Sequence, residues 1–278
     1  MPFLSVRQKI KRTPILGSAL LSVYRLLSSR QMQDTKSMTN ESTPLCKICG
    51  GTTTDVFGLP RSKRTGHEIP NAADDARYFE CLSCRSLFTA ALDKDDHTRI
   101  YDDKYWKQDD PDWYGKVDQT LRLVLMATEL LSRRPDEMEI LDFGCGMGGF
   151  VERSREHLQM KTWGTDIIEP QKAREFFLRD LGSKRFDAIV ACEVIEHLPD
   201  PGSTFRMMRE HLKSPGVIAF QTAYWDPSLD RTWWYLGPAN GHITHYSPAG
   251  FDHMFKALGG EDRRLWGGYP GVQAWLFR

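Results

Sequence analysis

Apolar and polar positions follow two periods along the second half of the chain, one typical of helices and one of strands. Val117–Leu131 has the helical period, and the apolar run Ile140–Phe143 after it is typical of a buried parallel strand. Later runs predict strands at 162–165, 216–222, 261–266 and 272–277, and helices at 201–212 and 248–258. This alternation predicts an α/β domain with a doubly wound, mostly parallel sheet.

A glycine-rich turn, Gly144–Gly149, follows the first strand, and a helical pattern resumes at Phe150. Glycines at a strand-to-helix turn let the backbone pass close to a ligand, and the helix start offers free N–H groups. Dinucleotide enzymes use the same turn, so the turn alone does not identify the ligand. Two acids narrow the choice: Asp142 inside the strand end, and Asp166, twenty residues after Gly146.

The segment Phe-Asp-Ala-Ile-Val-Ala-Cys-Glu-Val-Ile-Glu-His-Leu at 186–198 completes the series. Together with the glycine turn and Asp166, it resembles the class I S-adenosylmethionine (SAM)-dependent methyltransferases. The stretch Glu-Val-Ile-Glu-His-Leu-Pro-Asp-Pro at 193–201 is close to their small-molecule branch. The resemblance implies a Rossmann-like class I methyltransferase sheet of seven strands that binds SAM at the carboxyl ends of the strands. A nucleotide-binding fold of other chemistry and a degenerate copy are the open alternatives.

The resemblance also assigns roles to single residues. Asp166 would accept hydrogen bonds from both ribose hydroxyls, Asp180 would meet the adenine amino group, and Asp142 would hold the glycine loop or the methionine ammonium. The full set expected to contact SAM is Asp142, Gly144, Cys145, Gly146, Asp166, Ile167, Asp180 and Glu193. Only thirteen residues lie between Asp166 and Asp180, too few for a full helix and strand. We therefore expect the third strand and the helix before it to be truncated.

Candidates for the chemistry follow the fourth strand. Methyl transfer from a sulfonium is an in-line displacement, which needs a nucleophile held near the methyl carbon and a group that takes its proton. We expect Glu193, His197 and His245 to be catalytic, and helical geometry would place 193 and 197 on one face with Glu196 beside them. Gly-His-Ile-Thr-His at 241–245 offers His242 as a further histidine.

The Glu-x-x-Glu-His pattern of 193–197 resembles the divalent-metal site of the ubiquinone-pathway O-methyltransferases and of the small-RNA 2′-O-methyltransferases, where a downstream histidine completes the site. The resemblance implies a Mg²⁺ ion at Glu193, Glu196 and His197, which would bind a substrate hydroxyl and lower its pKa. Glu-His-Leu is also widespread in this superfamily without a metal. A histidine that orients or deprotonates the acceptor is therefore the alternative.

An aromatic stretch follows the fifth strand and contains Tyr224, Trp225, Trp233, Trp234 and Tyr235. In this fold the region overhangs the acceptor pocket, where flat aromatic faces suit sugar or phenol rings. The alternative is an inserted lid with a small core of its own.

Four of the six cysteines form two Cys-x-x-Cys pairs, Cys46 with Cys49 and Cys81 with Cys84, and 31 residues lie between the pairs. Two such pairs can place four thiolates around one structural Zn²⁺ ion, which would supply folding energy to a small module. The long spacing predicts an insertion loop at 61–75. Two disulfides and unrelated free cysteines are the alternatives. Zinc-bound thiolates indicate a reducing compartment, in practice the cytoplasm.

The chain has 278 residues and a formal net charge of zero. This length suits one sizeable domain plus a small module. The charge is uneven, because residues 1–30 hold six basic residues and no acid, which leaves the rest of the chain at −6. A nucleic-acid enzyme usually has a basic face over its main domain, so the acidic body argues against a nucleic-acid partner.

Residues 1–30 have the pattern of a basic amphipathic helix, whose apolar core, Pro14–Tyr24, is too short to span a bilayer. This helix could contact the inner membrane surface peripherally, act as a targeting peptide, or pack on the protein's own body. We expect a linker at 31–44, a zinc-ribbon-like module at 45–90, a connector at 91–116 and a methyltransferase domain at 117–278.

A Cys-x-x-Cys-Gly start, a second Cys-x-x-Cys, a Tyr-Asp-x-x-Tyr-Trp connector and a methyltransferase core resemble bacterial proteins of sugar and cell-surface polysaccharide clusters, among them zinc-containing deoxysugar methyltransferases. The resemblance implies O-methylation of a small-molecule or glycan-type acceptor in polysaccharide biosynthesis. Fold-level analogy does not fix a substrate. The alternatives are an RNA methyltransferase with zinc-ribbon recognition and a non-catalytic SAM-fold scaffold.

Overall fold

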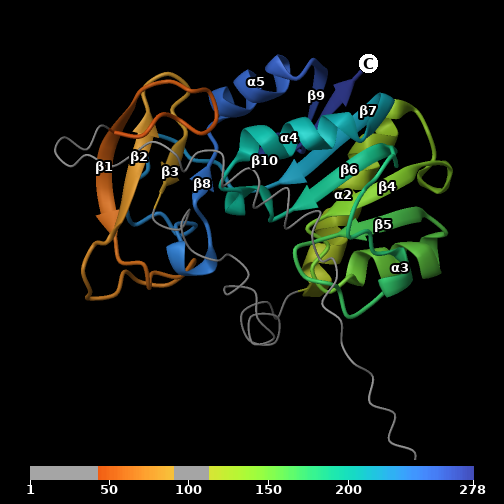
Figure 1. Cartoon of the computed structure of the whole chain (residues 1–278), viewed down its shortest axis with the longest axis horizontal. Coiled ribbons are helices and arrows are strands. Elements are labelled where there is room, and N and C mark those ends of the chain that lie inside the picture. Colours follow the sequence, from red (N-terminus) through yellow and green to blue (C-terminus); the bar gives the residue numbers. More distant parts are fainter. Residues whose placement is uncertain (1–42, 91–112) are drawn as a thin grey trace, which may run out of the picture. The chain divides into compact units, whose positions relative to one another are not determined.

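Six strands form the central sheet in the computed structural model, which describes residues 43–90 and 113–278 (Figure 1). Their order is β5-β4-β6-β7-β10-β9. The parallel strands are β4 (Glu139–Phe143), β5 (Lys161–Thr165), β6 (Phe186–Cys192) and β7 (Leu212–Gln221), and the antiparallel β10 (Tyr269–Phe277) lies between β7 and β9 (Gly260–Trp266). The chain runs from β4 to β5 on one side and returns to β6 on the other, which puts the topological switch point at β4.

The predicted class I sheet is confirmed, with six strands rather than seven in the described part of the chain. What would be the third strand is reduced to one parallel bridge between Gly164 and Phe177, after the 3₁₀ turn η4 (Arg174–Phe176). The expected truncation is therefore present, because the short segment after Asp166 has room for one turn and one bridge only.

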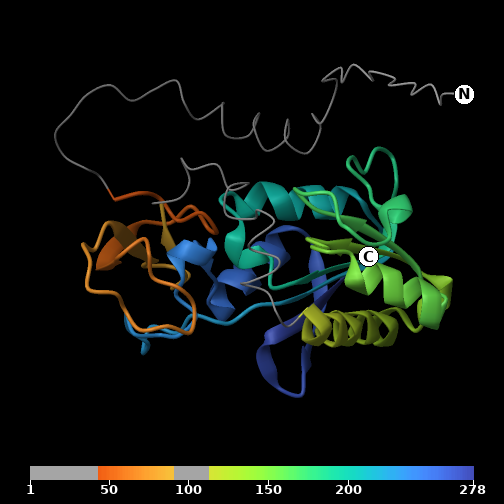
Figure 2. The same ribbon diagram turned by 90° about the horizontal axis from the view of Figure 1, so that it is seen from below.

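Helices cover both faces of the sheet (Figures 1 and 2). One face carries α2 (Trp113–Leu131) and α3 (Gly149–Leu158), and the other carries α4 (Pro201–Glu210) and α5 (Pro248–Ala257). Alternate residues of β7 pack against the helices on opposite faces of the sheet. Val217 and Ala219 pack towards α2, and Ile218 and Phe220 pack towards α4 and α5. Successive side chains of a strand point to opposite faces, so a strand buried on both sides is a continuous apolar run.

A second, antiparallel sheet has the order β1-β2-β3-β8. It comprises β1 (Thr53–Leu59), β2 (Ala76–Cys81), β3 (Leu87–Thr89) and β8 (Thr244–His245). The first three strands belong to the predicted zinc-ribbon-like module, and the expected insertion loop joins β1 to β2. β8 comes from the methyltransferase part of the chain, so the two predicted domains share a sheet. Both lie in one compact unit, residues 38–278.

The expected helix through 193–197 is absent. The chain instead forms the short 3₁₀ turn η5 (Ile195–His197), and Glu193 has a left-handed backbone with φ 54°. A residue with positive φ cannot continue an α-helix, which explains the difference. Two other 3₁₀ turns are η3 (Pro135–Glu137) and η6 (Pro238–Asn240).

The helix expected at 1–30, most of the linker at 31–44 and residues 91–112 of the connector lie outside the described residues. Among the helices that the structure does describe, none is long and apolar enough to cross a bilayer. The predicted peripheral membrane contact stays a prediction.

Candidate active site

The carboxyl ends of the four parallel strands meet at one edge of the sheet, and acids are concentrated there. Asp142 lies inside the end of β4, Asp166 follows β5, and Glu193 follows β6. Thr222 follows β7. Ligands of doubly wound folds bind at this edge beside the switch point, so this is where we place the candidate active site.

The glycine turn after β4 has a shape that side chains would not allow. Gly144 has φ 77°, and an added Cβ would lie 2.4 Å from Cγ2 of Val194. Gly148 has φ 81°, and an added Cβ would lie 2.4 Å from the carbonyl oxygen of Lys172. Only glycine permits this backbone. The turn leads into α3, whose first N–H groups face the strand ends and can meet a ligand.

Asp166 supports the turn from the neighbouring strand. Its carboxylate accepts hydrogen bonds from the N–H of Gly146 at 2.8 Å and of Ile168 at 3.3 Å. Burial raises the pKa of Asp166, although these N–H groups oppose the shift. A carboxylate has room for more hydrogen bonds than these two, so ribose hydroxyls can still donate to it.

Asp142 is 4% exposed. Burial, and then the charge of Asp166, raise the pKa of Asp142 to about 8. A carboxyl group held in this state is ready to ionise when a cation arrives.

Cys145, Asp180 and Ile167 are three further residues that we expect to contact SAM. Cys145 is buried, and a Cβ added to Gly164 of β5 would lie 2.8 Å from its sulfur, so its side chain packs between turn and strand. Asp180 is exposed and accepts a hydrogen bond from the N–H of Gly182 at 2.9 Å. Ile167 is half-buried beside Asp166. Contacts of these three residues with SAM stay predictions.

A cavity of about 260 Å³ opens beside Glu193. Its lining comprises Lys116, Gln119, Glu193, Gln221, Thr222, Ala223, Trp234 and Tyr235. Most of these side chains carry donors or acceptors, and Trp234 is 57% exposed. The sequence singled out only Glu193, Trp234 and Tyr235 of this set, because the others are ordinary polar residues whose convergence depends on the fold.

Buried Glu196 and His242 form a cluster with half-buried His197, with one ligand atom of each within 4.8 Å of the others. Oε1 of Glu196 lies 3.5 Å from Nε2 of His197 and 3.9 Å from Nε2 of His242. Within the described residues this oxygen has no hydrogen-bond partner. Burial, and then the charge of Glu193, raise the pKa of Glu196 to about 8.

The tautomer of His242 follows from its contacts. Nδ1 lies 3.0 Å from the carbonyl oxygen of Tyr235, and a carbonyl can only accept, so Nδ1 carries the proton. Burial, and then His197, lower the pKa of His242 well below its usual value, which keeps the ring neutral. Nε2 therefore presents a lone pair towards Glu196, as in histidines that ligate metals.

Tyr235 connects the two glutamates, a role that the sequence did not indicate. Its hydroxyl donates to Oε2 of Glu193 at 2.7 Å and lies 3.1 Å from Oγ1 of Thr222. Thr222 in turn lies 3.0 Å from Oε2 of Glu196. Nε2 of Gln221 donates to the other oxygen of Glu193 at 3.3 Å. Glu193 and Glu196 both follow β6 and are held by one hydrogen-bonded set, which comprises Gln221 and Thr222 at the end of β7 and Tyr235.

His245 is fully buried, and neither of its ring nitrogens has a hydrogen-bond partner in the part of the chain that the structure describes. It packs among aromatic rings, with centroids 5.4 Å from Trp233 and 6.1 Å from Tyr78. The structure therefore brings His242, not His245, to Glu196 and His197. The catalytic role expected for His245 has no contact in its favour.

The aromatic stretch after β7 divides into two parts. Trp225 is 2% exposed and its indole N–H donates to Oε2 of Glu80 in β2 at 3.2 Å. Trp225 and Trp233 join the core of the antiparallel sheet, whereas Trp234 and Tyr235 line the cavity. The stretch thus has no core of its own, and its role in an acceptor pocket stays a prediction.

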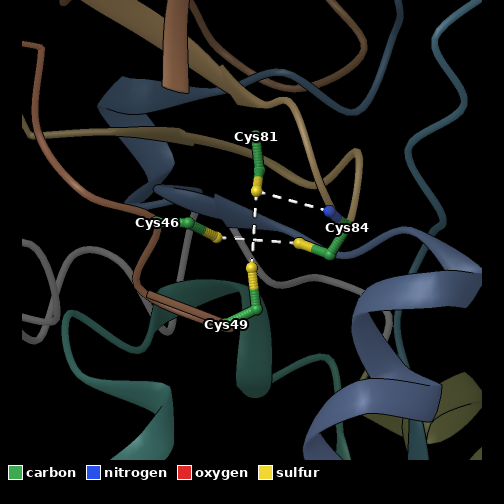
Figure 3. Close-up of side chains that lie close together, drawn as sticks. All are labelled: Cys46, Cys49, Cys81 and Cys84. Carbon is green, nitrogen blue, oxygen red and sulfur yellow. Dashed lines mark hydrogen bonds between the residues drawn. The ribbon is translucent and has the colours of Figure 1, made fainter. Parts of the chain in front are cut away.

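The four paired cysteines converge at the antiparallel sheet, with their sulfurs directed at one another (Figure 3). Sγ of Cys46 lies 3.6 Å from Sγ of Cys84, and Sγ of Cys49 lies 3.4 Å from Sγ of Cys81. Four sulfurs around Zn²⁺ at about 2.3 Å would stand about 3.8 Å apart. None of them forms a disulfide. The hydrogen bond from Cys46 lowers the pKa of Cys84 to about 5, which favours a thiolate. The residues present thus fit the predicted zinc ion.

A comparison with known protein families identifies the family of this chain. A family model described as a methyltransferase domain matches residues 117–264. The chain belongs to this methyltransferase family. The predicted enzyme class, a SAM-dependent methyltransferase, is confirmed by this match.

Curated relatives of this methyltransferase include ubiquinone biosynthesis O-methyltransferases. That of Histophilus somni is 32% identical over 107 residues, which are 31% of this chain and 45% of that protein. That of Pseudomonas syringae is 25% identical over 155 residues, 49% of this chain and 64% of that protein. The chain therefore spans about half the length of the curated relatives it matches.

Two solved structures are similar at lower identity. The 1,6-didemethyltoxoflavin-N1-methyltransferase of Burkholderia thailandensis is 15% identical, with a TM-score of 0.48, covering 71% of this chain and 98% of that one. A sugar N-methyltransferase from Streptoalloteichus is 16% identical, with a TM-score of 0.46, covering 63% of this chain and 92% of that one.

We expect Asp166→Ala to weaken SAM binding by roughly 1–3 kcal/mol, because the ribose loses charge-assisted hydrogen bonds and the glycine turn loses its acceptor. Isothermal titration calorimetry measures this. Asp136→Ala, at a partly exposed acid of η3, is the matched control. Equal affinity in the two variants would mean that Asp166 does not hold SAM.

SAM affinity should rise with pH up to about 8. The ligand-free methyltransferase holds Asp142 protonated below its pKa of about 8, whereas the positive charges of SAM favour the ionised form. Binding below this pH must therefore release a proton, which weakens affinity by up to about tenfold per pH unit as the pH falls. Titrations at several pH values should show this slope in the native protein and a flatter one in Asp142→Asn.

We expect one zinc ion per chain, bound by Cys46, Cys49, Cys81 and Cys84. Metal analysis of the purified protein measures it, and a thiol reagent should find these four cysteines protected until a chelator is added. Cys81→Ser should lose the zinc and unfold the module, because the bound ion supplies the module's folding energy. Four reactive thiols in a folded, zinc-free module would rule the site out.

Proposed function

We propose that this methyltransferase transfers a methyl group from SAM to a hydroxyl oxygen of a small-molecule acceptor with a sugar-type ring. One observation carries the proposal. The SAM-side acids, the Glu193 cavity and the cluster of Glu196, His197 and His242 all lie at the carboxyl ends of the parallel strands. The ubiquinone O-methyltransferase relatives support an oxygen acceptor, and a role in cell-surface polysaccharide synthesis is the context we propose for it.

The cavity favours a hydroxylated ring. Gln119, Gln221 and Thr222 offer donors and acceptors around a space that holds one small ring, and Lys116 adds a cation. Trp234 stands at the same wall with much of its ring exposed, so it can stack on a flat or puckered ring without a large ordering cost. A long isoprenoid tail has no counterpart among the named lining residues.

Glu193 is the group best placed to take the acceptor's proton. It lines the cavity, and burial raises its pKa towards the range in which a carboxylate acts as a base. Tyr235 and Gln221 fix its two oxygens. The hydroxyl proton would pass to Glu193 as the oxygen attacks the methyl carbon, and the sulfonium electron pair would return to the sulfur of the departing cofactor.

The second cluster fits a divalent metal ion. Oε1 of Glu196 and Nε2 of His242 and of His197 converge, and a buried oxygen that has no hydrogen-bond partner in the described residues is unfavourable unless a cation compensates it. His242 takes the place that the sequence gave to Glu193 in this set. Two imidazoles and one carboxylate suit Mn²⁺, Fe²⁺ or Zn²⁺ better than Mg²⁺. Such an ion would lower the pKa of an acceptor hydroxyl.

We expect His197→Ala to reduce turnover by on the order of 10²-fold or more with little change in SAM affinity, because the acceptor loses a positioning or activating group and the cofactor side is untouched. Transfer of labelled methyl from SAM to fractionated cell extract measures turnover. The exposed His157, changed to Ala, is the control.

The metal and metal-free versions give different results. If a divalent ion takes part, added Mn²⁺ raises the activity of the zinc-loaded protein, and Glu196→Gln fails as His197→Ala does. If His197 acts alone, added Mn²⁺ has no effect on the zinc-loaded protein. Full activity of His197→Ala in metal-free buffer would contradict both versions.

A further inference from the structure

We infer that the zinc module positions the acceptor half of the active site, while the cofactor half is held independently of zinc. The inference rests on the proposed zinc site. The link is the segment Ile243–Ser247, called here the bridging segment, which contains β8 and lies between the zinc module and η5. A module that only recruited substrate would not need to be connected to η5 by hydrogen bonds through this segment.

On the module side, the bridging segment is bound along its whole length. β8 pairs with β3, with Leu87 opposite His245, and the N–H of Thr89 donates to the carbonyl oxygen of Ile243 at 2.9 Å. At its end, the Ser247 hydroxyl donates to the carbonyl oxygen of Cys84, one of the four predicted zinc ligands. The N–H of Ser247 also donates to Oγ of Ser86 at 3.1 Å. The chain at and just after Cys84 thus holds the Ser247 end of the bridging segment, and β3 holds the Ile243 end.

On the catalytic side, the same segment holds η5. The N–H of Ile243 donates to the carbonyl oxygen of Glu196 at 3.0 Å. Oγ1 of Thr244 donates to the carbonyl oxygen of Leu198 at 2.8 Å. The hydroxyl of Tyr246 donates to the carbonyl oxygen of Ile195 at 2.8 Å. These three bonds bracket the turn that carries Glu196 and His197.

These contacts are shielded from water. Ile243, Thr244 and Tyr246 are all fully buried. Buried hydrogen bonds leave costly unsatisfied groups when one partner moves, so the bridging segment and η5 must shift together. A displacement at the second cysteine pair would therefore reach the Glu196 cluster through backbone already in contact.

The cofactor half has its own supports. Asp166 binds the backbone of Gly146 and Ile168, and the N–H of Gly144 donates to the carbonyl oxygen of Thr165 at 2.8 Å. All of these bonds lie within residues 144–168, in the turn between β4 and α3 and at the end of β5. SAM binding should therefore survive changes that loosen the bridging segment.

Ser247 is the residue through which the coupling can be cut without touching a zinc ligand. Its Oγ accepts from the N–H of Gly250 at 2.9 Å as the N-cap of α5, besides donating to Cys84. Ser247→Ala removes both bonds. Ser247→Thr retains a hydroxyl that can make both, so it serves as the matched control. Ser247 acts through η5 and is a positioning residue.

The first experiment removes zinc from the full-length protein with a mercurial and a chelator and follows hydrogen–deuterium exchange. Exchange should rise about tenfold or more at 193–198 and 242–250, and stay within about twofold at 139–168. S-adenosylhomocysteine, titrated as the probe, should bind with nearly unchanged affinity. Unchanged protection at 193–198, or loss of S-adenosylhomocysteine binding, would overturn the inference. Purified protein without zinc would instead refute the zinc site itself.

The second experiment uses zinc-loaded variants. Ser247→Ala should keep one zinc per chain and full S-adenosylhomocysteine binding, yet raise exchange at 193–198 by about tenfold, the effect of about 1.4 kcal/mol of lost local stability. Ser247→Thr should restore the native exchange. If Ser247→Ala exchanges like the native protein at 193–198, the bridging segment does not carry the coupling.

Discussion

Carboxyl groups buried at one edge of the sheet are the constraint to which the rest of the structure responds. Asp142 and Glu196 have almost no exposed surface, and Asp166 and Glu193 are half-buried beside them. A buried carboxylate is unfavourable unless donors or a cation compensate its charge. The protein supplies N–H donors to Asp166 and hydroxyl groups to both glutamates. The negative charge that these donors leave uncompensated favours cationic ligands. SAM is such a ligand on the β4 side, and a divalent ion would be one on the β6 side.

The features of this edge that could be predicted from the sequence are those formed by residues close together in the chain. The apolar run of β4, the glycine turn and Asp142 are consecutive, and the topology of an α/β sheet dictates that such strand ends meet. The shortened third strand could be predicted by counting, since the residues between Asp166 and Asp180 cannot form a helix and a strand. Its remnant, the bridge at Phe177, agrees with that count.

What could not be predicted depends on contacts between distant segments. Periodicity carries no information about the pairing of β8 with β3, yet this pairing turns His245 into the aromatic core and leaves His242 beside Glu196. The hydroxyl of Tyr235 reaches Glu193 across 42 positions of sequence. Side-chain spacing alone predicted a helix through 193–197, and the left-handed backbone of Glu193 prevents that helix. Such backbone strain is common at functional sites.

The two halves of the site differ in what supports them. The cofactor half stands on parallel strands that helices cover on both faces. The acceptor half depends on β8, which is two residues long and could not persist without the three-residue β3 beside it. β3 in turn begins just beyond the second cysteine pair. Contacts therefore run from the second cysteine pair to β3, from β3 to β8, and from the segment around β8 to the turn that carries Glu196. In such an arrangement, the position of the turn with Glu196 can vary with the position of the module, while the glycine turn and Asp166 on the SAM side keep their geometry.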